Sequence, residues 1–489
     1  MAQGAFVVLN SRYPRWCVLV VWSVGILLAT DISGASARPG DPDPSFGRGG
    51  LGSVAPDPGA QPVLRDLVRL PDGELLASGG SKPGQSGILA RFEADGSPDR
   101  TFGSDGLVRT KSSLWAKLVP VEDGKVVAFG RSGKNAAVAR FDPDGSLDDG
   151  FGDGGVKVLD LRSLFETTEA TLEARGAGID SSGRVVAFVE VGTCSLSDEG
   201  DVDRKISNLD SGFCGDSAVV RLTPEGELDS TFGNGDGLRI IPVPGNQATA
   251  TLTPQDQVLI ASVAFINMGD IDVPNQGWRI IQRLQQDGAA DKGFGERSWA
   301  VFEDGSDHPM AGLLEAGDQG KVTVSFGGVL MRLLENGKRD KSFGNRGRAP
   351  TGTSGLIQRN NLNLRLGDGV ITQDHIYLAG SATHSRRSGG RWSVVIRLNL
   401  DGMPDPTFSN DGLAARKIGP FVKFSLLERR IGMLSGRLLV DGSGRTIVGA
   451  TGGAAENLRF TLSRFQGGKG KRLSCDGEPA TVQGTPGDD

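Results

Sequence analysis

Residues 91–103 read RFEADGSPDRTFG, and the fold follows from this stretch because the chain repeats it. In each copy an apolar run ends in Arg followed by Phe or Leu and then a Gly-containing turn, and in most copies a Phe-Gly pair comes next. In six copies an Asp lies eight residues after the Arg. The recurring residues are Arg91, Arg140, Arg221, Arg283, Arg332, Arg397 and Arg464; Asp99, Asp148, Asp229, Asp291, Asp340 and Asp405; and Phe46, Phe102, Phe151, Phe232, Phe294, Phe343 and Phe408. Their mean spacing of about 60 residues indicates stacked or radially arranged units.

A second recurring element is a turn followed by a short apolar run, as in EDGKVVAFGR at 122–131. Short runs rich in Val, Ile and Leu and bounded by turn residues are typical of buried strands. Further strand candidates precede this run and follow the Phe-Gly turn, so each unit offers four strands. One such sheet cannot bury both of its faces, whereas a closed ring of sheets can. The sequence therefore predicts an all-β, seven-bladed β-propeller with four-stranded antiparallel blades of about 60 residues.

Taken together, R-[LF]-x-x-[DN]-G-x-x-D-x-x-F-G and G-[KR]-[VIL]-[VL] resemble the delta-60 repeat of secreted bacterial β-propellers. The resemblance covers about residues 38–466 and implies a propeller fold without an established activity, because that family is defined by its repeat. The chain departs from the motif at Ser409, which replaces the Gly after Phe408, and at Ser298, which interrupts the glycine pattern after Phe294. Where each blade starts, and whether a swapped terminal strand closes the ring, stays open at this level.

Composition supports the all-β prediction. The chain has 74 glycines among 489 residues, about double the usual share, and each Gly inside a helix costs up to about 1 kcal/mol relative to Ala. The formal net charge is −6, so the chain has no excess of basic residues with which to bind a nucleic acid.

The N-terminus has the pattern of a targeting segment. Arg12 and Arg15 precede the apolar run WCVLVVWSVGILLA at 16–29, and Ala-Ser-Ala follows at 35–37. This order predicts a secretory signal peptide at 1–37, with an uncleaved anchor as the alternative. The apolar run is shorter than the ~20 residues that span a bilayer. We therefore expect an extracellular protein with no membrane span after cleavage, a propeller at 38–466 and a polar, Gly-rich tail at 467–489.

The recurring residues are predicted to be structural, because a catalytic set needs unique residues that meet at one place. The Phe is expected to pack between adjacent blades, and the Asp to accept backbone N–H bonds in its turn. The Arg is expected to bind turn carbonyls or that Asp. The alternative to a structural role is a calcium site in the loop Asp142–Asp148, because its carboxylates resemble the oxygen-rich ligand set that calcium prefers. The position of Asp142 is Glu93, Thr223, Gln285, Leu334 and Asn399 in the other copies, so the first ligand is not kept and we expect no cofactor.

Cys194 and Cys214 bound the longest insertion, a polar and acidic segment. In an exported chain this arrangement predicts a disulfide-closed loop, since no further Cys or His lies nearby to complete a metal site. The state of Cys475 is left open by this pairing. The last residues resemble the entry into a hemolysin-type (RTX) calcium repeat, but the chain ends where such a repeat would begin. We expect a stub by default, with a truncated sequence as the alternative.

No sequence motif assigns an activity. The three histidines have no ligand-spaced partner, and neither a G-x-S-x-G elbow on a strand-to-helix turn nor a P-loop occurs. We expect a monomeric, non-enzymatic binding or scaffold module for an unknown protein or glycan. The alternative is a secreted propeller hydrolase or lyase that acts on a carbohydrate or a lactone at the channel mouth, and it rests on fold-level analogy.

Overall fold

The computed structural model divides into two compact units, Met1–Ala37 and Arg38–Asp489, and the second contains every strand described below. The described residues are 37–56, 62–81, 86–111, 113–162, 164, 172–174, 177–191, 217–241, 246–266, 276–296, 298–303, 311–326, 329–350, 362–384, 390–420, 436–454, 457–468, 474–475 and 478–479.

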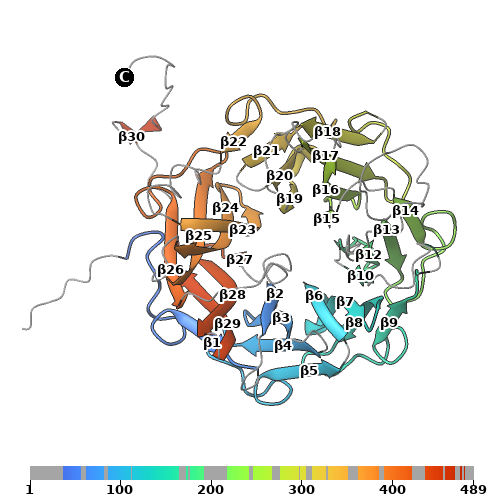
Figure 1. Cartoon of the computed structure of the whole chain (residues 1–489), viewed down its shortest axis with the longest axis horizontal. Helices are drawn as coiled ribbons and strands as arrows, with labels where there is room; N and C mark the ends of the chain where they lie inside the picture. The colour runs from blue at the N-terminus through green and yellow to red at the C-terminus, as the bar shows by residue number, and fades with distance from the viewer. Residues whose placement is uncertain are drawn as a thin grey trace, which may run out of the picture. The chain divides into compact units, whose positions relative to one another are not determined.

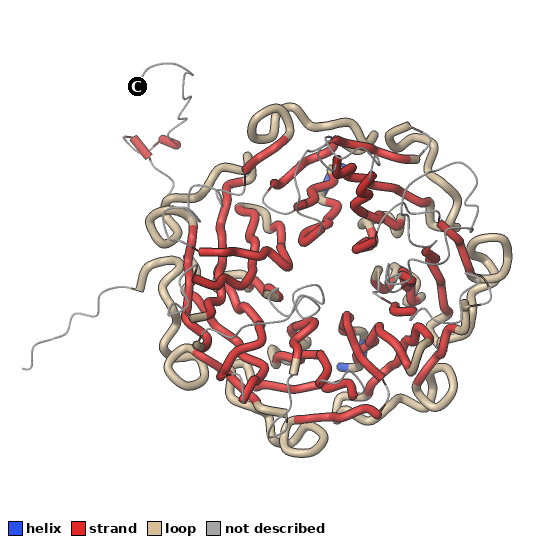
Figure 2. Tube along the Cα trace, viewed as in Figure 1, coloured by secondary structure: helices blue, strands red, loops and turns tan. Residues whose placement is uncertain are grey.

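The second unit is a ring of seven antiparallel sheets, which confirms the predicted seven-bladed β-propeller (Figure 1). Six sheets have four strands, and the third has an additional short strand, β11 (Gly178–Ile179), paired with β12. Strands dominate the trace (Figure 2), and the described helical turns are η1 (Glu122–Gly124) and η2 (Asp318–Gly320). None of the helices described is long and apolar enough to cross a membrane.

The blades are numbered along the chain, each from its inner to its outer strand. Blades 1 to 3 consist of β2 (Val63–Arg69), β3 (Leu75–Ser81), β4 (Ser86–Phe92), β5 (Leu107–Lys111); β6 (Ser113–Pro120), β7 (Val126–Ser132), β8 (Asn135–Phe141), β9 (Val156–Leu159); and β10 (Leu172–Ala174), β12 (Val185–Val191), β13 (Ser217–Leu222), β14 (Leu238–Ile241). Blades 4 and 5 consist of β15 (Asn246–Leu252), β16 (Val258–Ile266), β17 (Gln276–Leu284), β18 (Trp299–Glu303); and β19 (Ala311–Ala316), β20 (Val322–Phe326), β21 (Val329–Leu333), β22 (Arg348–Pro350). Blades 6 and 7 consist of β23 (Leu362–Ile371), β24 (His375–His384), β25 (Arg391–Asn399), β26 (Leu413–Gly419); and β27 (Arg437–Val440), β28 (Thr446–Ala454), β29 (Asn457–Phe465), β1 (Leu51–Val54). A separate pair, β30 (Ser474–Cys475) and β31 (Glu478–Pro479), follows the last blade.

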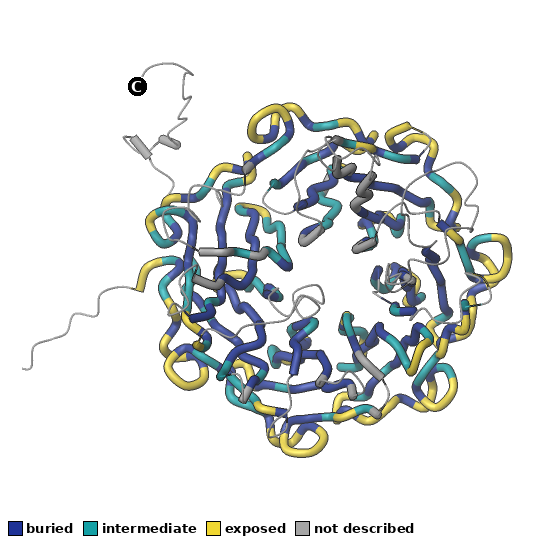
Figure 3. Tube along the Cα trace, in the orientation of Figure 1, coloured by how far each residue is buried: buried dark blue, intermediate teal, exposed yellow. Residues whose placement is uncertain are grey.

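The core is divided among the contacts between neighbouring blades. Seven clusters of buried apolar side chains each combine residues from two adjacent sheets. The buried tube in Figure 3 accordingly follows the strands, while the connecting turns are exposed. Each blade is thus held by its two neighbours, because that is where its apolar faces leave water.

The two ends of the propeller are joined in blade 7. The strand β1, from the beginning of the ring, pairs antiparallel with β29 from its end, with Leu51 opposite Ser463 and Val54 opposite Phe460 (Figure 1). This pairing settles the blade phase that the sequence left open. The ring is closed by non-covalent strand pairing between distant parts of the chain.

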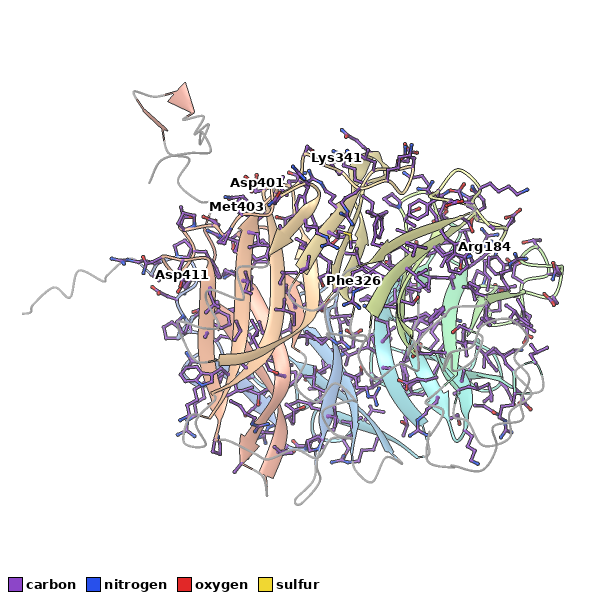
Figure 4. All side chains as sticks on the ribbon, turned by 45° about the horizontal axis from the view of Figure 1, so that its top comes forward. Arg184, Phe326, Lys341, Asp401, Met403 and Asp411 are labelled. Carbon is purple, nitrogen blue, oxygen red and sulfur yellow. The ribbon has the colours of Figure 1, made fainter. Side chains whose placement is uncertain are left out.

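The connections fall on two opposite edges of the ring because the strands alternate in direction. Turns between the first and second strands and between the third and fourth strands share one edge, here named the repeat-turn edge. Lys341, Asp401 and Met403 belong to such turns and lie along one side of the ring in Figure 4. The Arg, Asp and Phe-Gly of every repeat therefore lie at this edge.

Candidate functional site

The seven copies of the repeat form one structural unit, repeated around the ring. The Arg Nε donates to the Asp eight residues later, at 2.5 to 2.9 Å in five of the six copies that lie within one sequence stretch and at a shorter contact for Arg140 and Asp148. The guanidinium carbon lies 4.4 to 5.0 Å from the centre of the Phe ring of the same copy. The other Asp oxygen accepts the backbone N–H two residues further on. Each Arg is thus paired with a carboxylate and an aromatic face.

The seventh copy combines residues from both ends of the ring. Arg464 donates Nε to Asp43 at 2.7 Å and lies 4.6 Å from the ring centre of Phe46. Asp43 in turn accepts the N–H of Ser45 at 3.0 Å. Sequence reasoning missed the Arg464–Asp43 pair, although Asp43 precedes Phe46 by the same three residues that separate Asp99 from Phe102.

The same side chains connect neighbouring blades. Six of the seven arginines donate Nη1 to a main-chain oxygen of the following blade, at 2.5 to 3.3 Å. The N–H after the Phe also reaches the following blade, as from Gly103 to the carbonyl of Asp144 at 3.1 Å. The seven phenylalanines are at most 3% exposed. Together these contacts make the outer part of each seam, the contact zone between two blades.

The two departures from the motif keep the backbone that glycine has in the other copies. Ser409 has a φ of 54° and Ser298 a φ of 78°. Ser409 donates its N–H to the carbonyl of Pro39 at 2.9 Å, so the N-terminal residues also complete the seam between blades 6 and 7.

A further position of the repeat, where the second strand of a blade begins, supplies another partner for the Asp in several blades. Lys125 lies 2.8 Å from Asp148, Lys321 lies 3.3 Å from Asp340, and His375 lies 3.1 Å from Asp405. Burial by itself would raise the pKa of Asp340, but its bonds to Ser342 and Lys321 and the charge of Arg332 lower that pKa to about 2. The seam carboxylates are therefore ionised at neutral pH.

Blade 1 differs in charge, because Glu74 occupies this position. Glu74, Glu93 and Asp99 bring three carboxylate oxygens within 4.8 Å of one another. The guanidinium of Arg91 lies among them, with Nε 3.1 Å from Glu74 and 2.5 Å from Asp99. This arginine already supplies positive charge to the cluster, so we assign no metal there.

The loop singled out as a calcium alternative has protein partners for each of its carboxylates. Asp142 lies 3.1 Å from Lys125, and Asp144 accepts the N–H and the hydroxyl of Ser146 at 2.9 and 2.6 Å. Asp148 is bound by Lys125 and Arg140. Cys194 and Cys214, the predicted disulfide, lie outside the described residues.

The inner parts of the seams use acidic side chains that sequence reasoning did not identify. Asp66 accepts the N–H of Leu118 in the next blade at 2.7 Å, and Asp368 accepts that of Leu438 at 3.0 Å. Also on the inner strands, Arg65 on β2 pairs with Glu173 on β10 at 2.9 Å. These groups satisfy one another and the backbone, which buried charges require. They thus contribute to holding the inner strands together.

Glu315 belongs to this inner set, because it accepts the N–H of Ile371 in the next blade at 3.0 Å. Burial raises its pKa to about 7, against that bond and with the help of nearby Asp368. The folded protein therefore holds this proton more tightly than the unfolded chain, and stability should fall between about pH 4.5 and 7.

Glu315→Gln keeps an acceptor and removes the titration. We expect the variant to be about 1 to 3 kcal/mol more stable than the parent at pH 8, and equal to it near pH 4.

Urea unfolding of parent and variant at both pH values tests this expectation. Glu225→Gln offers a matched control, because it makes the same substitution at an exposed residue. A stability difference between Glu315→Gln and the parent that is the same at pH 4 and pH 8 would contradict it.

A pocket lies at the repeat-turn edge between blades 4 and 5. It consists of two hollows, of about 690 and about 450 Å³, and Arg283, Gln319 and Glu335 line both. Six carboxamide side chains line one or the other hollow: Gln255, Gln257, Gln285, Gln286, Gln319 and Asn336. The apolar core beneath this seam is intact, as is the bond from the Gly295 N–H to the Asn336 carbonyl at 2.8 Å. The opening is therefore confined to the turn edge.

Arg283 distinguishes this seam from the other six. Its Nε pairs with Asp291 at 2.6 Å and its guanidinium lies 4.7 Å from the ring centre of Phe294, as in every copy. The carbonyl corresponding to the usual acceptor of Nη1 is that of Glu335, and among the described residues neither Nη of Arg283 has a hydrogen-bond partner. Arg283 is only 7% exposed, yet it lines both hollows. A buried cation with unused donors thus faces the pocket.

The side chains that line the pocket can form hydrogen bonds with a polar ligand. Carboxamides both donate and accept hydrogen bonds, and a guanidinium donates in a planar fork. Gln257 donates to the side chain of Gln285 at 3.1 Å, and Gln286 donates to the Gln255 carbonyl at 2.9 Å, so part of the lining is already oriented. No sequence pattern indicated this site, because its residues belong to the turns of two different blades.

Comparison with known proteins agrees with the fold. Residues 70–102, 122–151, 215–232 and 374–408 match the family described as "Domain of unknown function (DUF5122) beta-propeller". These stretches lie in blades 1, 2, 3 and 6 and support a propeller family. No curated protein matches the sequence.

Solved structures are similar at low identity. A protein of unknown function from Dyadobacter fermentans DSM 18053 is 10% identical, with a TM-score of 0.41, over 85% of this chain and 98% of that one. The PQQ-bound aldose sugar dehydrogenase from Streptomyces coelicolor is 13% identical, with a TM-score of 0.35, over 78% and 99%. The polysaccharide lyase Uly1 is 8% identical, with a TM-score of 0.39, over 82% and 89%. We transfer no activity from these structures.

Proposed function

We propose that this protein is an extracellular, non-enzymatic binding module whose ligand occupies the pocket between blades 4 and 5. The observation that carries the proposal is Arg283, a 93% buried cation whose Nη donors find no acceptor in the described part of the chain. These donors are not among the buried atoms that lack a partner, so water reaches them at the pocket, and a ligand that accepts from them exchanges that water for a charge-assisted hydrogen bond. In each of the six equivalent arginines, Nη1 already donates to the next blade.

Export is supported by the leader-like N-terminus and by the position of Arg38. The backbone nitrogen of Arg38 lies 2.8 Å from an Asp41 carboxylate oxygen. Cleavage after Ala37 would turn this nitrogen into an ammonium group beside that carboxylate. The mature protein would thus begin with a charge pair next to the residues that complete blade 7.

The proposal is tested on protein purified from the culture medium of a bacterium that expresses the full chain, with its N-terminus sequenced. A library of sugars, acidic sugars, amino acids and short peptides is screened by thermal shift, and hits are measured by calorimetry. We expect Arg283→Gln to weaken binding of a hit at least about tenfold, since a bond to a charged group contributes about 1.5–3 kcal/mol. Arg332→Gln is the matched control, because Arg332 holds the same place in the next seam but donates Nη1 to Leu400 at 2.9 Å.

The control variant is expected to lose stability and keep the affinity. Hits that bind Arg283→Gln as tightly as the parent would place the ligand elsewhere and overturn the proposal, as would a screen without hits. Products released from a bound hit would overturn its non-enzymatic part.

A further inference from the structure

We infer that the pocket between blades 4 and 5 takes a carboxylated sugar, of which a hexuronate is the simplest example. This inference rests on the proposed binding function and names the class of ligand. It follows from three properties of the site: the oriented donors of Arg283, the charges around them, and the carboxamides that line one or the other hollow.

The donors of Arg283 are held in place before any ligand arrives. Asp291 fixes Nε, and the ring of Phe294 lies against the guanidinium plane. The two Nη groups are thus left as a fixed fork, which matches two oxygens of one carboxylate or phosphate. Because the fork is rigid, little conformational entropy is lost when it binds.

The surrounding charges limit the charge of an anion that the site can hold, because the acidic side chains at the pocket outnumber the basic ones. Asp291 already balances Arg283, and Lys321, which lines the smaller hollow, lies 3.3 Å from Asp340. Asp287 and Glu335 add two carboxylates to the lining, both on exposed residues. A phosphate dianion would meet more repulsion from these two acids than a carboxylate does. The site therefore suits one carboxylate better than one phosphate.

The rest of the lining suits hydroxyl groups. A sugar hydroxyl donates and accepts hydrogen bonds, as does each carboxamide of Gln255, Gln286 and Gln319. Leu334 adds an apolar side chain to the smaller hollow, against which the C–H face of a sugar ring can pack. The hollows of about 690 and 450 Å³ are within the usual range for ligand sites, about 300–1,000 Å³. A carboxylate on a polyhydroxylated ring can bind both the Nη donors of Arg283 and the carboxamides of the lining.

Calorimetry of the full-length protein with matched ligands tests the inference. The probes are galacturonate and its short oligomers, the methyl ester of galacturonate, galactose, a galactose phosphate, and lactate as a carboxylate without a sugar ring. We expect galacturonate to bind at least about tenfold more tightly than its methyl ester or galactose, because both lack the charge that Arg283 meets. Lactate should be weaker because it lacks the ring hydroxyls, and the sugar phosphate weaker because of Asp287 and Glu335.

Variants assign this preference to the pocket. Arg283→Gln should remove the advantage of galacturonate over its methyl ester, while Arg332→Gln should keep it. If Arg283→Gln fails to fold, the ester comparison on the parent still tests the carboxylate, and Gln286→Ala tests the pocket through a loss of affinity for galacturonate. Equal affinities for acid and ester, or tighter binding of the sugar phosphate, would overturn the ligand class. In that case, Arg283-dependent binding of any other probe would still support the proposed function.

Discussion

A chain that lacks residues 38–54 is expected to lose the closed ring and more than about 5 kcal/mol of stability, which approaches the total for many domains. The deletion removes β1, the outer strand of blade 7, and leaves β29 as an unpaired edge. It also removes Asp43 and Phe46, the partners of Arg464. The fully buried ring of Phe46 alone is worth about 3–5 kcal/mol by analogy with Phe→Ala changes in protein cores. Denaturant unfolding and size-exclusion chromatography measure the loss.

The control is a chain that ends at residue 479, which keeps every strand of every blade. It should unfold at nearly the same denaturant concentration as the full-length protein. Addition of a peptide of residues 38–54 should restore part of the lost stability, because the strand is held by pairing and packing alone. A truncated chain without 38–54 that stays monomeric, with an unchanged midpoint, would show that β1 is dispensable.

The second large effect is expected from Gly96→Ala, at the turn of blade 1 that covers Phe46. Gly96 has a φ of +88°, and a Cβ there would lie 2.5 Å from the Phe46 ring. The left-handed backbone costs a non-glycine residue about 1–2 kcal/mol, and the clash adds an overpacking cost of about 1–3 kcal/mol. We therefore expect a loss of about 2 to 5 kcal/mol, measured by urea unfolding.

Gly154→Ala separates the two causes. Gly154 has a φ of +57°, and a Cβ there would meet no atom within 4 Å. This variant should therefore show only the backbone cost of about 1–2 kcal/mol. Equal losses in the two variants would mean that Phe46 moves aside freely, and that the tight packing between blades 7 and 1 contributes little.

Much of the outer seam could be predicted from the sequence, because it is encoded locally. Arg397, Asp405 and Phe408 lie within one short stretch, and the pairing of Arg397 with Asp405 at 2.7 Å follows from that stretch together with its turn. The same locality explains why Ser409 and Ser298 alter the motif without altering the backbone of their copies. The spacing of these copies was sufficient to predict the number of blades.

The contacts of the inner seam could not be predicted from the local sequence. Asp66 and Glu315 lie in local sequences that share no pattern. Each carboxylate accepts a hydrogen bond from a backbone N–H of the next blade, and this contact gives the residue its role. The buried acidity of Glu315 likewise depends on what packs over it. Nothing in its own strand marks it as a group with a raised pKa.

The sequence by itself determined the strands, their turns, the Arg–Asp–Phe units and thus a ring of seven sheets, since each of these depends on residues that are close along the chain. Only the tertiary structure decided that β1 completes the last blade and that Arg283 faces a pocket instead of a carbonyl. Both features depend on how two separate segments meet. The energy of these contacts depends on distances in space, which cannot be read from the order of the residues.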